Sequence, residues 1–262
     1  MPDIWNDGSG YESYVGRWSR RVAREFLQWL AVRPGSAWLD FGCGTGALSQ
    51  TILAEAAPRL VIGCDRSPGY VAFARQQTSD ARAEFAVAEL PHLPRITEGF
   101  DAAVAGLVLN FLPTPAEGVA AMRARVRPGG TVAAYVWDYA EGMQLMRIFW
   151  DTAIALDPSA RELDEGRRFP LCRADAFGEL FRSAGLPDVL VRPIVVPTVF
   201  EDFEDLWSPF LMGQGPAPGY VMGLAPERRA LLRDTIRQRL PVAADGTIPL
   251  SARAWAVRGI AV

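Results

Sequence analysis

The chain has 262 residues, and all 27 of its basic side chains are arginine, because the sequence contains no lysine and only one histidine, His92. A lysine Schiff base and a Walker A phosphate loop are therefore excluded. A zinc site built on two or three histidines is excluded as well. Half of the residues are apolar and the net charge is −3, which is typical of a globular protein without a basic surface for nucleic acid.

Three cysteines without a Cys-x-x-Cys pair predict neither a disulfide framework nor a zinc ribbon, and we expect no bound metal. The first ten residues are polar and acidic, and no apolar run is long enough to cross a bilayer. We therefore expect no signal peptide, no membrane partner and a cytoplasmic location.

The first predicted element is a helix from about Ser13, in which apolar residues recur at three- and four-residue steps until Pro34-Gly35 ends it. Helices and short apolar runs then alternate as far as residue 138, which indicates βαβ units and a parallel sheet. The expected strands are 37–41, 59–64, 84–88, 100–106 and 131–137, with helices from about Gly46 and Pro68, a helix through Ala120 and Met122, and a turn at 127–130.

The regular alternation of helices and strands ends after Asp138. Helices are expected at 142–156 and 174–186, and strands at 189–200 and 251–262. Between these strands the chain is expected to be irregular near Trp207 and from Gly213 to Gly219, and helical only from Pro226 to Leu240.

A glycine-rich loop, FGCGTG (41–46), follows the first strand. Glycines let the backbone turn sharply and let a ligand approach main-chain atoms. A nucleoside triphosphate is excluded because the loop has no lysine. A dinucleotide stays open, since Ala47 stands where its fingerprint accepts Gly or Ala. The loop alone therefore does not decide among adenosine-bearing ligands.

Acidic side chains stand at the ends of three successive predicted strands: Asp40, Asp65 and Glu89. Asp40 would repel a pyrophosphate but suits a ligand with a cationic ammonium group. Asp65 can accept hydrogen bonds from both ribose hydroxyls, and Glu89 from an adenine amino group. Taken singly, Asp40 in a solvated tight turn and Asp65 as a helix-capping residue remain alternatives.

In this combination the sequence resembles the class I S-adenosylmethionine-dependent methyltransferases. WLDFGCGTG (38–46), VIGCDRSP (61–68) and AELPHLP (88–94) resemble the family's first three motifs. FDAAVAGLVLNFL (100–112) and RVRPGGTV (125–132) resemble its fourth strand and the turn before the fifth. The resemblance covers about residues 36–138 and, more loosely, 174–186. Two departures are Ala88-Glu89 in place of Gly-Asp, and Asn110 without the Pro-Pro-Tyr that many nucleic-acid base methylases carry.

The resemblance implies an α/β fold with a doubly wound, mostly parallel seven-stranded sheet, an antiparallel last strand and a helical cap. It divides the chain into an N-terminal helical segment (1–35) closing over the cofactor, a cofactor-binding core (36–138) and the remainder (139–262), with cap insertions near 139–172 and 201–247. The implied reaction moves a methyl group from S-adenosylmethionine to a small-molecule acceptor by in-line displacement and leaves S-adenosylhomocysteine. A non-catalytic or regulatory S-adenosylmethionine-binding protein is the alternative.

The resemblance also assigns roles to single residues. The expected cofactor-binding residues are Asp40, Gly42, Gly44, Gly46, Asp65, Arg66, Glu89, Leu90 and Gly106, with Tyr14 and Arg17 for the methionine carboxylate. The catalytic candidates are Asp138, Tyr139 and Asn110. For Arg17 the alternative is a solvated basic helix face, and for the three catalytic candidates it is an ordinary loop position.

The insertions are rich in aromatic and methionine side chains, which favours a lid over a small, partly apolar acceptor. The alternative is that these side chains form an ordinary core. The residues are Met143, Phe149, Trp150, Trp207, Phe210, Met212 and Tyr220.

Overall fold

The structure is a computed structural model that describes residues 16–212 and 215–262. These residues form two compact units. One unit comprises 19–136, 173–194 and 255–262, and we call it the glycine-loop unit because it contains residues 41–46. The other comprises 137–172 and 195–254 with the first residues of the N-terminal helix, and we call it the insertion unit.

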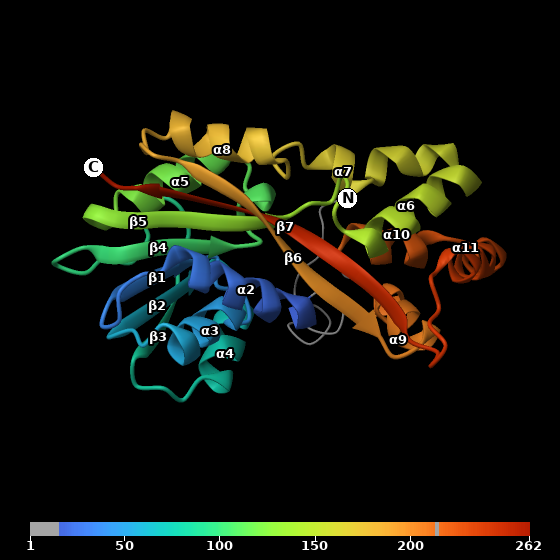
Figure 1. Cartoon of the computed structure of the whole chain (residues 1–262), viewed down its shortest axis with the longest axis horizontal. Coiled ribbons are helices and arrows are strands. Elements are labelled where there is room, and N and C mark those ends of the chain that lie inside the picture. The colour runs from blue at the N-terminus through green and yellow to red at the C-terminus, as the bar shows by residue number, and fades with distance from the viewer. Residues whose placement is uncertain (1–15, 213–214) are drawn as a thin grey trace. The chain divides into compact units, whose positions relative to one another are not determined.

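Seven strands form one sheet in the order β3-β2-β1-β4-β5-β7-β6 (Figure 1). The pairs β1–β2, β1–β4, β2–β3 and β4–β5 are parallel. All five residues of β1 are buried, as expected for a strand covered on both faces. The strands are β1 Ala37–Phe41, β2 Leu60–Asp65, β3 Ala83–Val87, β4 Phe100–Gly106, β5 Val126–Trp137, β6 Leu190–Phe200 and β7 Ile248–Ile260. The predicted doubly wound α/β fold is confirmed.

The last strand is antiparallel, as predicted. The amide of Ala261 donates to the carbonyl of Gly130, and the amide of Asp138 donates to the carbonyl of Arg253. Residue numbers therefore rise along β5 as they fall along β7. Strand β5 also begins earlier than predicted, because 127–130 is not a turn between elements. These residues form a bulge inside β5, where its pairing with β4 shifts from Phe100↔Val126 to Ala102↔Thr131.

The helices of the glycine-loop unit begin at recognisable signals. Helix α4 starts at Pro68, and the Ser67 side chain caps it by accepting from the Tyr70 amide at 3.4 Å. Helix α5 also starts at a proline, Pro115. The helices are α2 Arg17–Leu30 (whose first two residues belong to the insertion unit), α3 Ala47–Glu55, α4 Pro68–Gln77, η2 Leu109–Phe111, α5 Pro115–Arg123 and α8 Ala174–Ser183.

The insertion unit is mainly helical, and the region predicted to be irregular is not. Short helices occupy most of 203–223, where prolines at first turns start them rather than break them. The elements are α6 Gln144–Leu156, η3 Pro158–Leu163, α7 Glu165–Arg168, α9 Phe203–Trp207, η4 Ser208–Met212, α10 Pro216–Gly223 and α11 Pro226–Arg239.

Aromatic rings form the core of the insertion unit. Phe149 stacks on Phe210 with centroids 4.8 Å apart, and Trp150 contacts both Phe149 and Tyr220. Met143 is buried as well, whereas Met212 is about half exposed. Most of the residues that the sequence offered as a lid therefore pack against one another as a core. Among the described residues, no helix has both the length and the apolar character needed to cross a membrane.

Candidate functional site

The glycine loop leaves β1 at Phe41 and crosses toward β2. Gly42, Gly44 and Gly46 all have left-handed backbones, with φ of 69°, 52° and 88°. The amides of Gly42 and Cys43 donate to the carbonyl of Cys64 at 2.8 and 3.0 Å. A Cβ added to Gly42 would lie 2.5 Å from the Val108 side chain, whereas one on Gly44 would meet no described atom within 4 Å. The loop thus leaves space beside its own backbone at Gly44.

Asp65 at the end of β2 fixes this loop. One carboxylate oxygen accepts from the Gly44 amide at 3.0 Å, and the other accepts from the Ser67 amide at 2.8 Å. The second bond forms the turn that precedes α4, so the capping alternative describes part of what Asp65 does. The first bond adds a function that a capping residue does not need, because it holds the glycine loop. A ribose contact for Asp65 stays a prediction.

Asp40 is buried inside β1 with 1% of its surface exposed, so the alternative of a solvated aspartate is wrong. Its Oδ2 accepts from the Ser49 hydroxyl at 2.6 Å. Its Oδ1 is buried and has no partner among the described residues. Burial raises the pKa of Asp40 to about 7, and the nearby Asp65 carboxylate adds to this, while the bonds from Ser49 oppose it.

The loop after β3 lies on the same edge of the sheet. The Ala88 amide donates to the Asp65 carbonyl at 3.0 Å, and the His92 amide donates to the Glu89 carbonyl at 2.8 Å. Glu89 and His92 are exposed, and Leu90 is half-buried. Arg66, which follows Asp65, is also exposed. The structure therefore brings the predicted ribose and adenine residues to adjoining strand ends, joined by a backbone hydrogen bond.

Two further predicted residues lie at and beyond the end of β4. Gly106 needs to be glycine for packing, because an added Cβ would lie 2.6 Å from the Tyr135 hydroxyl. Asn110 in η2 is 9% exposed, and its Nδ2 is buried without a partner among the described residues. A buried donor without an acceptor is costly, so Asn110 is able to gain a hydrogen bond if a ligand presents an oxygen there.

The remaining candidates belong to the insertion unit and already have partners in the chain. Asp138 accepts from the Glu141 amide at 3.0 Å and from Arg253 Nε at 2.7 Å, so both carboxylate oxygens are used. The Arg17 guanidinium donates two hydrogen bonds to the Asp205 carboxylate, at 2.8 and 3.3 Å. The alternative of a solvated arginine is therefore wrong.

Tyr139 is buried against Phe169, with ring centroids 5.6 Å apart. Tyr14 lies outside the described residues. The catalytic roles of Asp138, Tyr139 and Asn110, and the carboxylate-binding role of Arg17, stay predictions.

Two residues that support the site were missed by sequence reasoning. Ser49 is fully buried and holds Asp40. Arg125 is 8% exposed and donates 3.1 Å hydrogen bonds to the carbonyls of Leu93 and Pro91 in the loop after β3. No local signal marks either residue, because a serine in a helix and one arginine among 27 are ordinary until the fold supplies their partners.

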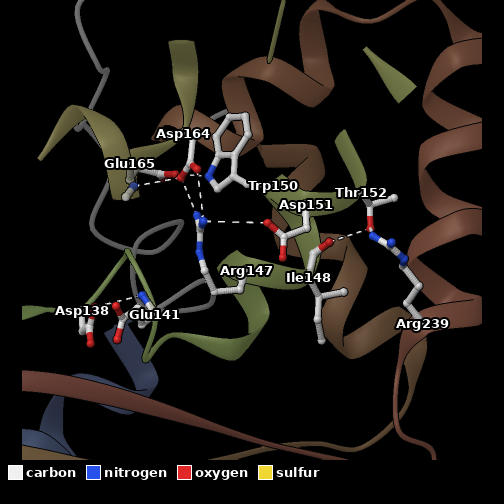
Figure 2. A network of polar contacts seen from close by, with 11 residues as sticks. Asp138, Glu141, Arg147, Ile148, Trp150, Asp151, Thr152, Asp164, Glu165 and Arg239 are labelled. Carbon is white, nitrogen blue, oxygen red and sulfur yellow. Dashed lines mark hydrogen bonds and ion pairs between the residues drawn. The ribbon is translucent and has the colours of Figure 1, made fainter. Parts of the chain in front are cut away.

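Buried charges also occur in the insertion unit, where Figure 2 shows Arg147 directed at Asp164 and Asp151. Beside them, the Trp150 indole donates to Glu165, which is 2% exposed. Burial raises the pKa of Glu165 to about 8, with the neighbouring Asp164 adding to the shift. The aromatic core of this unit is thus joined to a buried carboxyl that the sequence did not reveal.

Comparison with known families matches residues 39–132 to the model of a methyltransferase domain. This stretch begins in β1 and contains the glycine loop, Asp65, the β3–β4 loop and β4. Residues 39–132 are therefore similar in sequence to a methyltransferase domain. The predicted resemblance is confirmed, and the fold agrees with it.

Relatives of the chain include the ribosomal protein L11 methyltransferase of Burkholderia multivorans, 37% identical over 127 residues. The match covers 45% of this chain and 38% of that protein, so the chain spans well under half the length of this relative. Among solved structures, a putative methyltransferase from Bacillus halodurans has a TM-score of 0.59 at 13% identity, covering 91% of this chain and 97% of its own. A Haemonchus contortus phosphoethanolamine N-methyltransferase in complex with S-adenosyl-L-methionine has a TM-score of 0.59 at 16% identity, covering 97% and 57%.

These relatives correct one prediction. The sequence led us to expect a small molecule as the partner, whereas these curated relatives are named for a ribosomal protein. That expectation relied on the apolar side chains of the insertions, most of which are core residues of their own unit. The small-molecule prediction is therefore wrong as it was drawn.

Proposed function

We propose that the protein transfers a methyl group from S-adenosylmethionine to an acceptor. One observation carries the proposal: Asp40 Oδ1, a buried carboxyl oxygen without a partner in the described part of the chain, lies at the same sheet edge as a glycine loop whose Gly44 has open space beside it there. An ammonium group satisfies the carboxylate form of such a group, and a phosphate is repelled by it. S-adenosylmethionine carries an ammonium and no phosphate.

The residues of the glycine-loop unit fit this cofactor part by part. In the proposal, Asp40 receives the ammonium, and the loop from Gly42 to Gly46 lies along the methionine and ribose. Asp65 receives the ribose hydroxyls while it keeps the loop in place. Glu89 and Leu90 meet the adenine edge, and Gly106 offers backbone to the methionine end.

The cofactor supplies a methyl group on a positively charged sulfur, which an acceptor removes by in-line displacement. The chain's part is then to bind and align the reactants and to exclude water. A base is needed only where the acceptor atom must lose a proton. A protein without lysine and with one exposed histidine is able to meet these demands.

Binding is tested first by thermal unfolding with S-adenosylhomocysteine, S-adenosylmethionine and NADH. A ligand at a hundredfold excess over its dissociation constant adds about 2.7 kcal/mol of stability. We expect both adenosylated ligands to stabilise the protein and NADH to leave it unchanged. Asp65→Asn should lose this effect, because it weakens both the loop bond and the ribose contact. Asp175→Asn, which changes an exposed aspartate in α8, should keep it.

Turnover is tested by release of S-adenosylhomocysteine when the protein and S-adenosylmethionine are mixed with fractions of a cell extract, one of them ribosomal protein. Release with any fraction supports the proposal. Stabilisation by NADH alone contradicts it. Binding of S-adenosylmethionine without release from any fraction would identify the protein as a non-catalytic binder.

A further inference from the structure

Asp40 is held in a setting that disfavours its charged form. It belongs to β1, every residue of which is buried, and it is in register with Gly63 of β2 and Val104 of β4. Neither neighbour offers it a polar side chain. Its only hydrogen-bonding side chain among the described residues is Ser49 of α3, which donates to Oδ2. Oδ1 is buried and accepts no hydrogen bond from any residue that the structure describes.

The titratable groups around Asp40 supply no compensating positive charge. Cys43 comes from the glycine loop, and Cys64 and Asp65 come from β2. Each of these is neutral or negative in any protonation state. The charged group that acts on Asp40 is the Asp65 carboxylate, which raises the pKa of Asp40 further, and among the described residues Asp40 forms no ion pair with an arginine. A carboxylate at this position would therefore be buried and uncompensated, with a second carboxylate nearby.

We propose that Asp40 carries a proton in the ligand-free protein and releases it when the ammonium group of the cofactor binds. The inference deepens the proposed function and depends on it. The O–H bond of the Asp40 carboxyl breaks, the proton passes to solvent, and the resulting carboxylate pairs with the ammonium. Cofactor binding is thereby coupled to the loss of one proton.

Ser49 sets the pH at which this exchange occurs. Its hydroxyl donates to the carboxylate form and, together with the Ser49 backbone, opposes the effect of burial, which leaves the pKa of Asp40 at about 7. Both forms of Asp40 are then accessible near neutral pH. An ammonium within hydrogen-bonding distance favours the charged form and lowers the pKa of Asp40 in the complex. Ser49 acts through Asp40 and is a positioning residue.

The test is titration calorimetry of the full chain with S-adenosylhomocysteine, in buffers of differing ionisation enthalpy at pH 6, 7 and 8. The slope of observed enthalpy against buffer ionisation enthalpy counts the protons released. With a pKa of about 7 we expect nearly one proton at pH 6, about half at pH 7 and almost none at pH 8. Affinity should weaken about tenfold per pH unit below pH 6 and level off above pH 8.

Matched ligands and variants separate Asp40 from other groups. 5′-Methylthioadenosine keeps the adenosine and the thioether but lacks the amino acid, so it should bind without releasing the proton. Asp40→Asn removes the titrating group and gives the background to subtract. Ser49→Ala should move the release to higher pH, whereas Ser183→Ala, an exposed serine bonded to Glu179, should leave it in place.

The outcomes distinguish the two proposals. If S-adenosylhomocysteine does not bind at any pH, the proposed function fails. If it binds with no proton released at pH 6, the coupling is refuted while the function stands. Equal release by Ser49→Ala and the unmodified protein at pH 7 would also overturn the coupling, because it would assign the proton to another group.

Discussion

Gly42 and Gly44 share a left-handed backbone but have different surroundings. At Gly42 the missing side chain makes room for Val108, which is a demand of folding. At Gly44 no atom of the described chain lies where a Cβ would be, and the Gly44 amide itself donates to the Asp65 carboxylate. The two glycines can therefore be separated by experiment into one that serves packing and one that serves a ligand.

We expect Gly42→Ala to cost about 2–5 kcal/mol of unfolding free energy, the sum of backbone strain and overpacking. Gly44→Ala should cost only the strain, about 1–2 kcal/mol, yet weaken S-adenosylhomocysteine binding tenfold or more. Urea unfolding and calorimetry measure the two effects. Gly129→Ala is the matched control, because Gly129 has φ of 79° and open surroundings away from the loop. Wild-type affinity in Gly44→Ala would contradict the assignment.

At the scale of elements, the sequence predicts most of the sheet because its signals are local. Apolar runs such as 37–41 and 100–106 coincide with β1 and β4, and the prolines at 68 and 115 begin helices. The start of β5 was missed because Pro128-Gly129-Gly130 resembles a turn, and only the neighbouring strands reveal a bulge.

The candidate site was predictable to the same extent. Motif residues stand at fixed positions near the ends of strands, so Asp40 and Asp65 were found. Ser49 and Arg125 were not, because Ser49 contacts Asp40 from a different element, and the partners of Arg125 lie 32 and 34 residues before it in the chain.

Arg125 connects the entry to β5 with the loop that carries Glu89 and Leu90. Arg125→Met removes two hydrogen bonds to loop carbonyls and keeps much of the buried volume. We expect a loss of about 2–4 kcal/mol in urea unfolding and a several-fold weaker affinity for 5′-methylthioadenosine. Arg95→Met, at an exposed arginine of the same loop, should change neither. An unchanged affinity in Arg125→Met would show that the loop holds its shape without this arginine.

For the molecule as a whole, two buried acids make stability depend on pH in an unusual direction. The pKa of Asp40 rises from 3.8 to about 7 and that of Glu165 from 4.5 to about 8, in both cases chiefly through burial. Between the unfolded and folded values, the folded chain keeps protons that the unfolded chain has lost. The contribution of these groups to unfolding free energy therefore falls as pH rises from about 4 to about 8, and is constant above that range.

Glu165→Gln imitates the protonated form and still accepts from Trp150. We expect it to change stability little at pH 5 and to raise the melting temperature at pH 8, by an amount equivalent to several kcal/mol at about 1.4 kcal/mol per pKa unit. Thermal unfolding at the two pH values measures this difference. Glu162→Gln, an exposed neighbour in η3, should behave like the unmodified chain at both. An equal gain at pH 5 and pH 8 would mean that packing, and not ionisation, accounts for the effect.

The boundaries between the two units fall inside strands: between residues 136 and 137 in β5, 194 and 195 in β6, and 254 and 255 in β7. Each of these strands contributes residues to both units, and no exposed linker separates one unit from the other there. A truncation that ends the chain anywhere between residues 19 and 253 would remove part of both units. Exchange of the insertion unit for another would therefore cut three strands, a demand that substitution of single residues or insertion of a loop does not make.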